Sequence, residues 1–271
     1  MKQKKVIFRD TEIVEFCRAT LDTNEIHDPL FMAKLGKRVI VPGMFALSLT
    51  VNFSADFLKN HANSLKVLFN SLVSSGDFVT LCASSSDDDP SEIRLSAIKY
   101  RDTLTSNNEY TRLSVKETAF NTDHKGILRR LEVKPEQVGK FRQLIGAEDK
   151  DVAHFLFAVS YASQALIRSI DQPETEIEKE IDETINKNNT ISPFYRSLDI
   201  RIPNPFPVFD PVGELDYFIH FEREKLRKLY GAYVRCEHHG KVIFHAHYKL
   251  VGIANRVILR MAKTIKRYHP A

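Results

Sequence analysis

The chain repeats one order of secondary structure, and this repeat restricts the folds open to it. In the first half, a short amphipathic helix predicted over 12–20 precedes an apolar helix over 43–58 and four strand-like runs: 64–73, 77–84, 92–100 and 108–115. The second half offers the same order: a helix over 136–145, an apolar helix over 152–167, and runs at 195–202, 213–221, 229–238 and 241–251. A repeated order indicates two copies of one structural unit. We therefore predict two domains, 1–125 and 126–271.

The two apolar helices define the expected fold class. Apolar residues surround the first on nearly all sides, which is typical of a helix buried inside a domain, and the second is also expected to be buried. The strand-like runs are short and separated by turn residues, which favours antiparallel pairing. We predict an α+β fold in which two antiparallel sheets each wrap around a long buried helix. A charged helix or loop over 174–187 is expected on the surface.

The two halves differ in the connection between their helices. This connection is about twice as long in the first half, where it contains Asp22-Thr23-Asn24-Glu25-Ile26-His27. A carboxylate and a neutral imidazole held together can share a water molecule and move protons in both directions near neutral pH. We therefore predict that Asp22 and His27 are catalytic. Asn24 is expected to hold the loop or to orient Asp22.

The apolar helix of the first half begins at Pro42-Gly43-Met44. The first turn of a helix presents backbone N–H groups and the positive end of the helix dipole. Glycine also permits close approach of a ligand because it has no side chain. We predict that Gly43 stabilises negative charge on a reacting oxygen, and that Pro42 and Met44 contact the substrate.

Composition excludes several classes of function. The net charge of +4, from 39 basic and 35 acidic residues, does not indicate a nucleic-acid-binding protein. Three widely spaced cysteines, Cys17, Cys82 and Cys236, indicate no disulfide framework and fit a reducing compartment. No apolar run approaches the roughly 20 residues of a membrane helix. Arg9 and Asp10 end the first apolar run too early for a signal peptide. We expect a soluble, cytoplasmic protein.

We predict structural roles for the remaining histidines and for the basic C-terminal segment. His154 lies in the second apolar helix and is expected to be a hydrogen-bonded core residue. A Cys–His pair with metal-ligand spacing is not repeated, so no metal site is expected among Cys236, His238, His239, His245 and His247. Segment 256–267 combines basic and apolar residues and is expected to form a surface helix.

The motif region resembles a known family. The segment 16–29, followed by Ala33-Lys34 and Val41-Pro42-Gly43-Met44, is similar to the MaoC-like (R)-specific enoyl-CoA hydratases and 3-hydroxyacyl dehydratases. Their signature is Asp-x-Asn-Pro-x-His, followed by a helix start of the type Ala-His-Gly-Met. Glu25 replaces the motif proline here, and Pro42 replaces the histidine before the glycine. The family resemblance implies a double hotdog fold.

The resemblance also implies a reaction. Asp22 and His27 match the catalytic pair, Asn24 matches the motif asparagine, and Gly43 matches the glycine whose N–H polarises the thioester carbonyl. The expected reaction interconverts 2-enoyl and 3-hydroxyacyl thioesters of CoA or acyl carrier protein, without a cofactor. Lys34, Lys37 and Arg38 lie close in sequence to the motif and are candidates to bind the phosphates of such a substrate. Two hotdog units in one chain are compatible with a monomer or a homodimer.

Two other functions stay open at this stage. Hotdog thioesterases typically carry Asp-x-Asn-x-His, with histidine four residues after aspartate. The interval from Asp22 to His27 is five residues, which favours water addition over hydrolysis. The third candidate is a non-catalytic, acyl-binding hotdog subunit.

Overall fold

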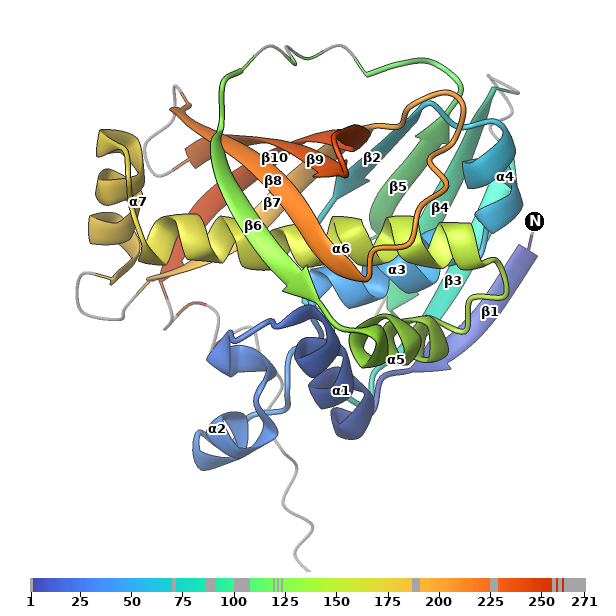
Figure 1. Cartoon of the computed structure of the whole chain (residues 1–271). Coiled ribbons are helices and arrows are strands. Elements are labelled where there is room, and N and C mark those ends of the chain that lie inside the picture. The colour runs from blue at the N-terminus through green and yellow to red at the C-terminus, as the bar shows by residue number, and fades with distance from the viewer. Residues whose placement is uncertain are drawn as a thin grey trace, which may run out of the picture.

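One antiparallel sheet of ten strands runs through the chain (Figure 1). The computed structural model describes residues 2–69, 72–85, 91–99, 108–118, 120, 122, 124–186, 191–224, 229–254, 257 and 260. The strand order is β1-β3-β4-β5-β2-β7-β10-β9-β8-β6. The strands are β1 (Lys2–Ile7), β2 (Ser64–Leu68), β3 (Phe78–Ser85), β4 (Glu92–Lys99), β5 (Asn108–Ser114), β6 (Ile127–Val133), β7 (Ile191–Arg201), β8 (Gly213–Arg223), β9 (Leu229–His238) and β10 (Lys241–Ala254).

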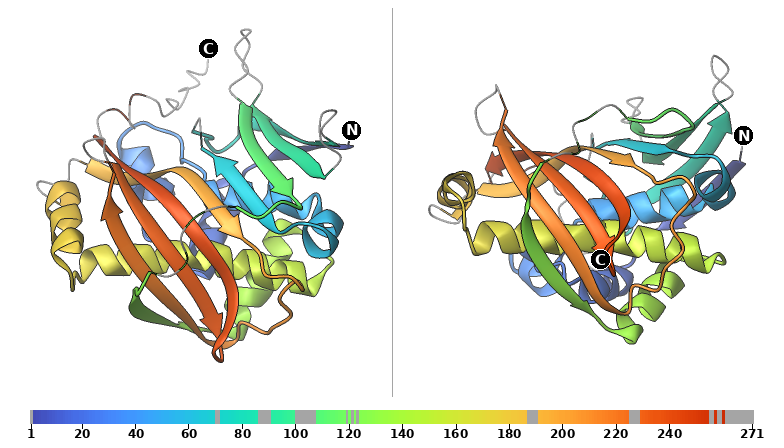
Figure 2. Two further views of the ribbon diagram at one scale, coloured as in Figure 1. Left: turned by 90° about the horizontal axis from the view of Figure 1, so that it is seen from above. Right: turned by 45° about the horizontal axis from the view of Figure 1, so that its top comes forward.

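The helices lie mainly on one side of this sheet (Figures 1 and 2). They are α1 (Asp10–Thr20), the short 3-10 helix η1 (Glu25–His27), α2 (Pro29–Lys34), α3 (Gly43–Asn52), α4 (Ala55–Asn60), α5 (Pro135–Ile145), α6 (Lys150–Asp171) and α7 (Glu176–Asn186). The sheet curves around α3 and α6, which therefore occupy the interior of the molecule.

The strand order confirms the repeat in the sequence. The first half reads β1-β3-β4-β5-β2 from its outer edge, and the second half reads β6-β8-β9-β10-β7 from the other edge. Each half thus has the same topology, and the halves meet where β2 pairs with β7. Leu65 lies opposite Ile200 and Val67 opposite Leu198 across this join. The proposed division at 125/126 falls just before β6 and stays a prediction.

The expectation of two separate sheets is wrong, because β2 and β7 are hydrogen-bonded neighbours in one sheet. The strands of the first half also do not pair simply in chain order, since β2 pairs with β5 rather than with β3. The pattern missed β1 and β6, which lie at the two edges of the sheet. In β1 almost every side chain is exposed, so the alternation that marks a half-buried strand is absent.

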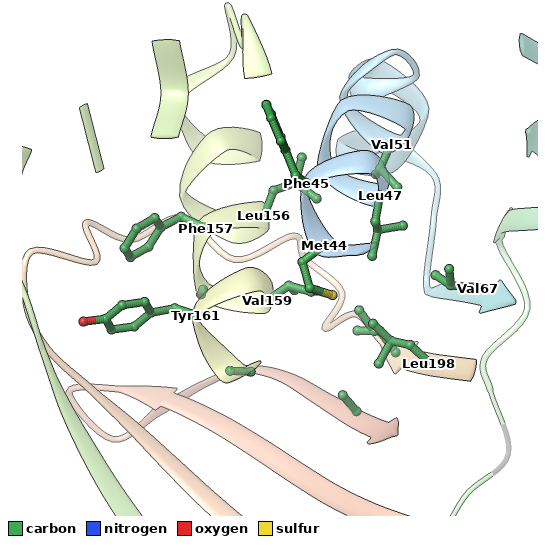
Figure 3. Packing of buried hydrophobic residues seen from close by; sticks show 14 of the residues in the cluster. Met44, Phe45, Leu47, Val51, Val67, Leu156, Phe157, Val159, Tyr161 and Leu198 are labelled. Atoms are coloured by element: carbon green, nitrogen blue, oxygen red, sulfur yellow. The ribbon is translucent and has the colours of Figure 1, made fainter. Parts of the chain in front are cut away.

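The two central helices differ in length. α6 has 22 residues, and Asp149 caps its N-terminus by accepting hydrogen bonds from the N–H groups of Asp151 and Val152. α3 has only 10 residues and is followed by the separate helix α4, so the single helix predicted over 43–58 is interrupted near residue 53. Figure 3 shows how Met44 and Phe45 of α3 lie next to Leu156 and Val159 of α6. A hydrogen bond of 3.0 Å between the hydroxyls of Ser48 and Ser160 also joins them.

α1 and α5 form a second pair beneath this core (Figure 1). Phe16 of α1 stacks on Phe45 with ring centroids 4.5 Å apart, and it lies 5.7 Å from the ring of Phe141 in α5. These contacts fix α1 against the helices of both halves. Leu21 then ends α1 in a left-handed conformation, with φ of 54°. The chain therefore turns sharply immediately before Asp22.

The structure also bears on the predictions made for the cysteines, for His154, for membrane helices and for the C-terminal segment. All three cysteines are free, and His154 is a buried core residue whose Nδ1 lies 2.7 Å from the carbonyl oxygen of Phe209. Within the described residues, none of the helices has both the length and the apolar character needed to span a membrane. The predicted helix over 256–267 lies outside the described residues except for Val257 and Arg260.

Candidate active site

The loop that follows α1 is held by hydrogen bonds within its own sequence. The Asp22 N–H donates to the carbonyl of Cys17 at 2.9 Å. The Asn24 N–H donates to Asp22 Oδ1 at 3.1 Å, and the Asn24 side chain accepts a hydrogen bond from the N–H of Ile26. Asn24 thus holds the carboxylate of Asp22 with its backbone and caps η1 with its side chain. Oδ2 of Asp22 is left to face His27.

The backbone contact of His27 fixes which of its nitrogens faces Asp22. Nδ1 lies 2.6 Å from the carbonyl oxygen of Ile40, and a carbonyl can only accept a hydrogen bond. Nδ1 must therefore carry a proton, which leaves a lone pair on Nε2 of the neutral ring. Nε2 lies 3.7 Å from Asp22 Oδ2, with side-chain exposures of 9% for His27 and 16% for Asp22. The pair is too far apart for a direct hydrogen bond and suits one oxygen atom bound by both.

The start of α3 is brought beside this pair by short backbone contacts. Ile40 donates its N–H to the carbonyl of Ile26, and Val41 donates to Val73. Pro42 precedes the first turn of α3, and Gly43 opens it. A Cβ atom at residue 43 would lie 3.0 Å from the ring of Phe69, which is closer than nearly all Cβ contacts. Glycine therefore lets the ring of Phe69 lie close to the backbone at the start of α3.

A cavity with about 940 Å³ of empty space, part of it open to solvent, lies next to these groups. Asp22, Asn24, His27, Pro42, Gly43 and Met44 line it, so the structure brings six of the nine predicted site residues together. The other wall comes from the second half of the chain. It is formed by residues of α6, β7 and β10: Ser163, Leu166, Ile167, Ile170, Phe194, Tyr195 and Leu250.

The residues of this second wall were not among the predicted site residues, although the family resemblance suggested that the second half enlarges an acyl cavity. Its residues come from an apolar helix and two strands, where apolar side chains are equally typical of a core. Only the fold places them opposite Asp22. The sequence did contain one indication of this wall. The second half of the repeat lacks an Asp–His motif of its own, and its long helix packs against the first half.

Two other ionisable side chains lie near Asp22, and both stay protonated. Burial raises the pKa of the Tyr195 hydroxyl above its usual range, although the hydroxyl of Ser163 lowers it, and the negative charge of Asp22 raises it further. Burial also raises the pKa of the Cys17 thiol, and the charge of Asp22 adds to this shift. Neither group is suited to accept a proton or to act as an anionic nucleophile near neutral pH. Asp22 and His27 thus stay the candidates for proton transfer at this site.

The three basic residues predicted to bind phosphate do not line this cavity. Lys34 is at the end of α2, on the exposed side of the loop. Arg38 instead forms an ion pair with Asp77, with 3.2 Å between Nη1 and Oδ1. Asp77 is 1% exposed and Arg38 25% exposed. The guanidinium of Arg38 is thus used to balance a buried carboxylate, and phosphate binding by Lys34 and Lys37 stays a prediction.

Replacing Arg38 by methionine tests this structural role. The substitution keeps most of the side-chain volume but removes the ion pair between Arg38 and the buried Asp77 carboxylate. We expect a loss of about 1–3 kcal/mol in the free energy of unfolding, because removing one partner of a buried pair is costly and the partial exposure of Arg38 reduces that cost. Urea denaturation measures it, with Lys34→Met as the control expected to change stability by less than about 0.5 kcal/mol. Equal stability of both variants would contradict the assignment.

The fold matches solved structures at low sequence identity. A MaoC-like dehydratase aligns with a TM-score of 0.54 and 9% identity, over 92% of this chain and 96% of its own. The bifunctional dehydratase-cyclase domain from ambruticin biosynthesis aligns with a TM-score of 0.58 and 12% identity, over 96% of this chain and 92% of its own. The peroxisomal multifunctional enzyme type 2 from Drosophila melanogaster aligns with a TM-score of 0.53 and 11% identity, over 92% of this chain and 48% of its own.

No family model matches the sequence. No curated protein matches it by sequence either. The structural matches cover nearly the whole chain, and they confirm at the level of the fold the resemblance that the motif region indicated. The chain has a MaoC-like hotdog fold of the α+β class.

Proposed function

We propose that this protein is an (R)-specific hydratase/dehydratase that interconverts 2-enoyl and 3-hydroxyacyl thioesters of CoA or acyl carrier protein. The observation that supports this most strongly is the pair formed by Asp22 Oδ2 and His27 Nε2, 3.7 Å apart at one end of a largely apolar cavity. Both atoms are hydrogen-bond acceptors that face each other. A water molecule, or the hydroxyl of a 3-hydroxyacyl group, can donate a proton toward this pair.

In the hydration direction, the pair binds one water molecule and directs its oxygen toward C3 of the enoyl group. Asp22 accepts a proton from the water as its oxygen bonds to C3, and C2 gains a proton to complete the addition. His27 orients the water through Nε2 and relays the proton from Asp22 to C2, so that both side chains return to their starting protonation states. In dehydration the same steps run backwards: C2 loses its proton and the C3 hydroxyl leaves as water. Each proton transfer of this kind is typically worth about 10²–10⁴ in rate.

The start of α3 supplies the third requirement of this reaction. Negative charge develops on the thioester oxygen when the thioester passes through an enolate-like state, before C2 gains its proton in hydration or after it loses one in dehydration. The Gly43 N–H is in the first turn of α3, where backbone N–H groups have no acceptor within the helix. An N–H donor aimed at such an oxygen typically contributes about 10²–10³ in rate. The thioester carbonyl would therefore lie near Gly43, between Pro42 and Met44.

The apolar wall from the second half gives the acyl chain a place to bind. Leu166, Ile167 and Ile170 of α6 line the cavity, together with Phe194 of β7. The second half has no Asp–His pair in the equivalent connection and contributes apolar surface instead. The active unit is then one chain with a single site, built by both hotdog halves.

A purified sample and a short 2-enoyl-CoA test this function directly. Loss of the conjugated enoyl absorbance, with no release of free thiol, is the result expected for hydration. Release of thiol without hydration would instead support the thioesterase that the fold also permits. Absence of both reactions with CoA and carrier-protein substrates would favour a non-catalytic, acyl-binding protein.

A further inference from the structure

A second group of polar side chains lies on the opposite face of the sheet from the cavity. Tyr248 of β10 points inward, and its hydroxyl donates to the carbonyl of Val159 in α6. Successive residues of a strand point to opposite faces, so His247 lies on the outer face. Glu222 of β8 and Glu224, just beyond the end of β8, approach it there. One ligand atom from each of the three side chains lies within 4.8 Å of the other two.

A glycine makes room for this group. Gly231 of β9 lies between the two flanking strands and is paired with Glu222 on one side and with Lys249 on the other. A Cβ atom at residue 231 would lie 2.9 Å from His247 Nε2 and 3.2 Å from Glu222 Oε1. Glycine weakens the interior of a strand, and it often marks a place where another group approaches the backbone closely. Here its missing side chain leaves a hollow in which an imidazole and a carboxylate meet.

The nitrogen that faces this hollow has no partner in the described part of the chain. His247 is 8% exposed, and its Nε2 is buried without a hydrogen bond to any described residue. A buried polar atom without a partner typically costs about 1–3 kcal/mol. The carboxylates of Glu222 and Glu224 form no hydrogen bond with this nitrogen, yet one oxygen of each lies within 4.8 Å of the imidazole ligand atom, a spacing that one ion can bridge.

Tyr233 holds both sides of the group in place. Its ring stacks on His247 with centroids 4.3 Å apart and planes 4° from parallel, and its hydroxyl donates to Glu222 Oε1 at 2.8 Å. Support of this kind for the residues that bind an ion is usual in metal sites. The Nζ atom of Lys249 lies 3.9 Å from Glu224 Oε1, and its positive charge partly balances the negative charge of the two carboxylates.

We propose that His247, Glu222 and Glu224 bind one Zn²⁺ ion over Gly231. One imidazole and two carboxylates form a donor set that suits zinc, with a fourth position left for water. The ion would join β8 to β10 across β9 on the outer face, while the sheet separates it from Asp22 and His27. Its role is then to tie the strands of the second half together. The sequence pattern missed it because Glu222 and Glu224 are distant from His247 along the chain and approach it only across three strands.

Isothermal titration of the metal-free, full-length protein with ZnCl₂ tests the site. We expect binding of one ion per chain and a higher melting temperature with zinc present. His247→Gln and Glu222→Gln should each weaken binding at least tenfold, since each removes a ligand while keeping the side-chain size similar. His239→Asn, in the exposed turn between β9 and β10, should leave binding unchanged. Circular dichroism of each variant confirms that it is folded.

Replacing zinc by Co²⁺ gives a readout that depends on ligand identity. The visible absorption of the bound Co²⁺ should change or disappear in His247→Gln and persist in His239→Asn. The proposal is wrong if the folded wild-type protein binds no Zn²⁺ in the titration, or if His247→Gln binds it as tightly as the wild type.

Discussion

Asp22→Asn is expected to lower kcat for hydration of a short 2-enoyl-CoA by about 10²–10⁴-fold. The amide has the shape of the carboxylate but cannot accept a proton from water near neutral pH. Its oxygen can still accept the hydrogen bond from the Asn24 N–H, which Asp22 Oδ1 accepts at 3.1 Å, so the loop should keep its conformation. We expect KM and the melting temperature to change little, because the substitution removes proton transfer rather than a binding contact.

The control for this experiment is Asp28→Asn, six residues further along the same loop. Asp28 accepts hydrogen bonds from the N–H groups of Leu30 and Phe31, and asparagine caps helices about equally well. This carboxylate is exposed and does not line the cavity, so its loss should leave kcat within about a factor of two. A similar fall in both variants would point to a general effect of charge. Full activity of Asp22→Asn would exclude Asp22 as the base.

The order of elements and the site loop could be predicted from the sequence because both depend on local patterns. Apolar periodicity marks α1, α3, α5 and α6, and the spacing from Asp22 to His27 is a property of one short loop. The structure adds what no local pattern contains. The carbonyl of Ile40 sets the tautomer of His27 across 13 residues of chain, and the pairing of β2 with β7 merges the two expected sheets into one.

Arg38 shows that the partner of a charged side chain also cannot be predicted from the local sequence. Its position directly after Lys37 and close in sequence to the motif favoured phosphate binding, yet its guanidinium pairs with Asp77, and only the tertiary fold buries that carboxylate. In the second half, apolar residues of α6 read as core in the sequence because a cavity wall and a core require the same side chains. Only the position of the cavity shows which residues of α6 line it and which belong to the core.

Filling the cavity from the second half should separate substrates by acyl length. Ile167 lies on α6, lines the cavity and is only partly buried, so Ile167→Phe should extend into empty space rather than into packed core. If the ring excludes three or four methylene groups, the loss is about 2.5–3 kcal/mol at 0.8 kcal/mol per group, or about 10² in kcat/KM for long chains. Short chains that end before α6 should react at the wild-type rate.

The ratio of kcat/KM for a long and a short enoyl thioester is the measurement that decides this point, since general damage to the site lowers both values and leaves their ratio unchanged. Ile177→Phe is the matched control, because Ile177 is in α7 and does not line the cavity. A changed ratio in Ile167→Phe alone means that the second half, which lacks an Asp–His pair, binds the acyl chain. An unchanged ratio places the acyl chain elsewhere and leaves α6 as core. The second half of the repeat would then have the same fold as the first but would not contribute to substrate binding.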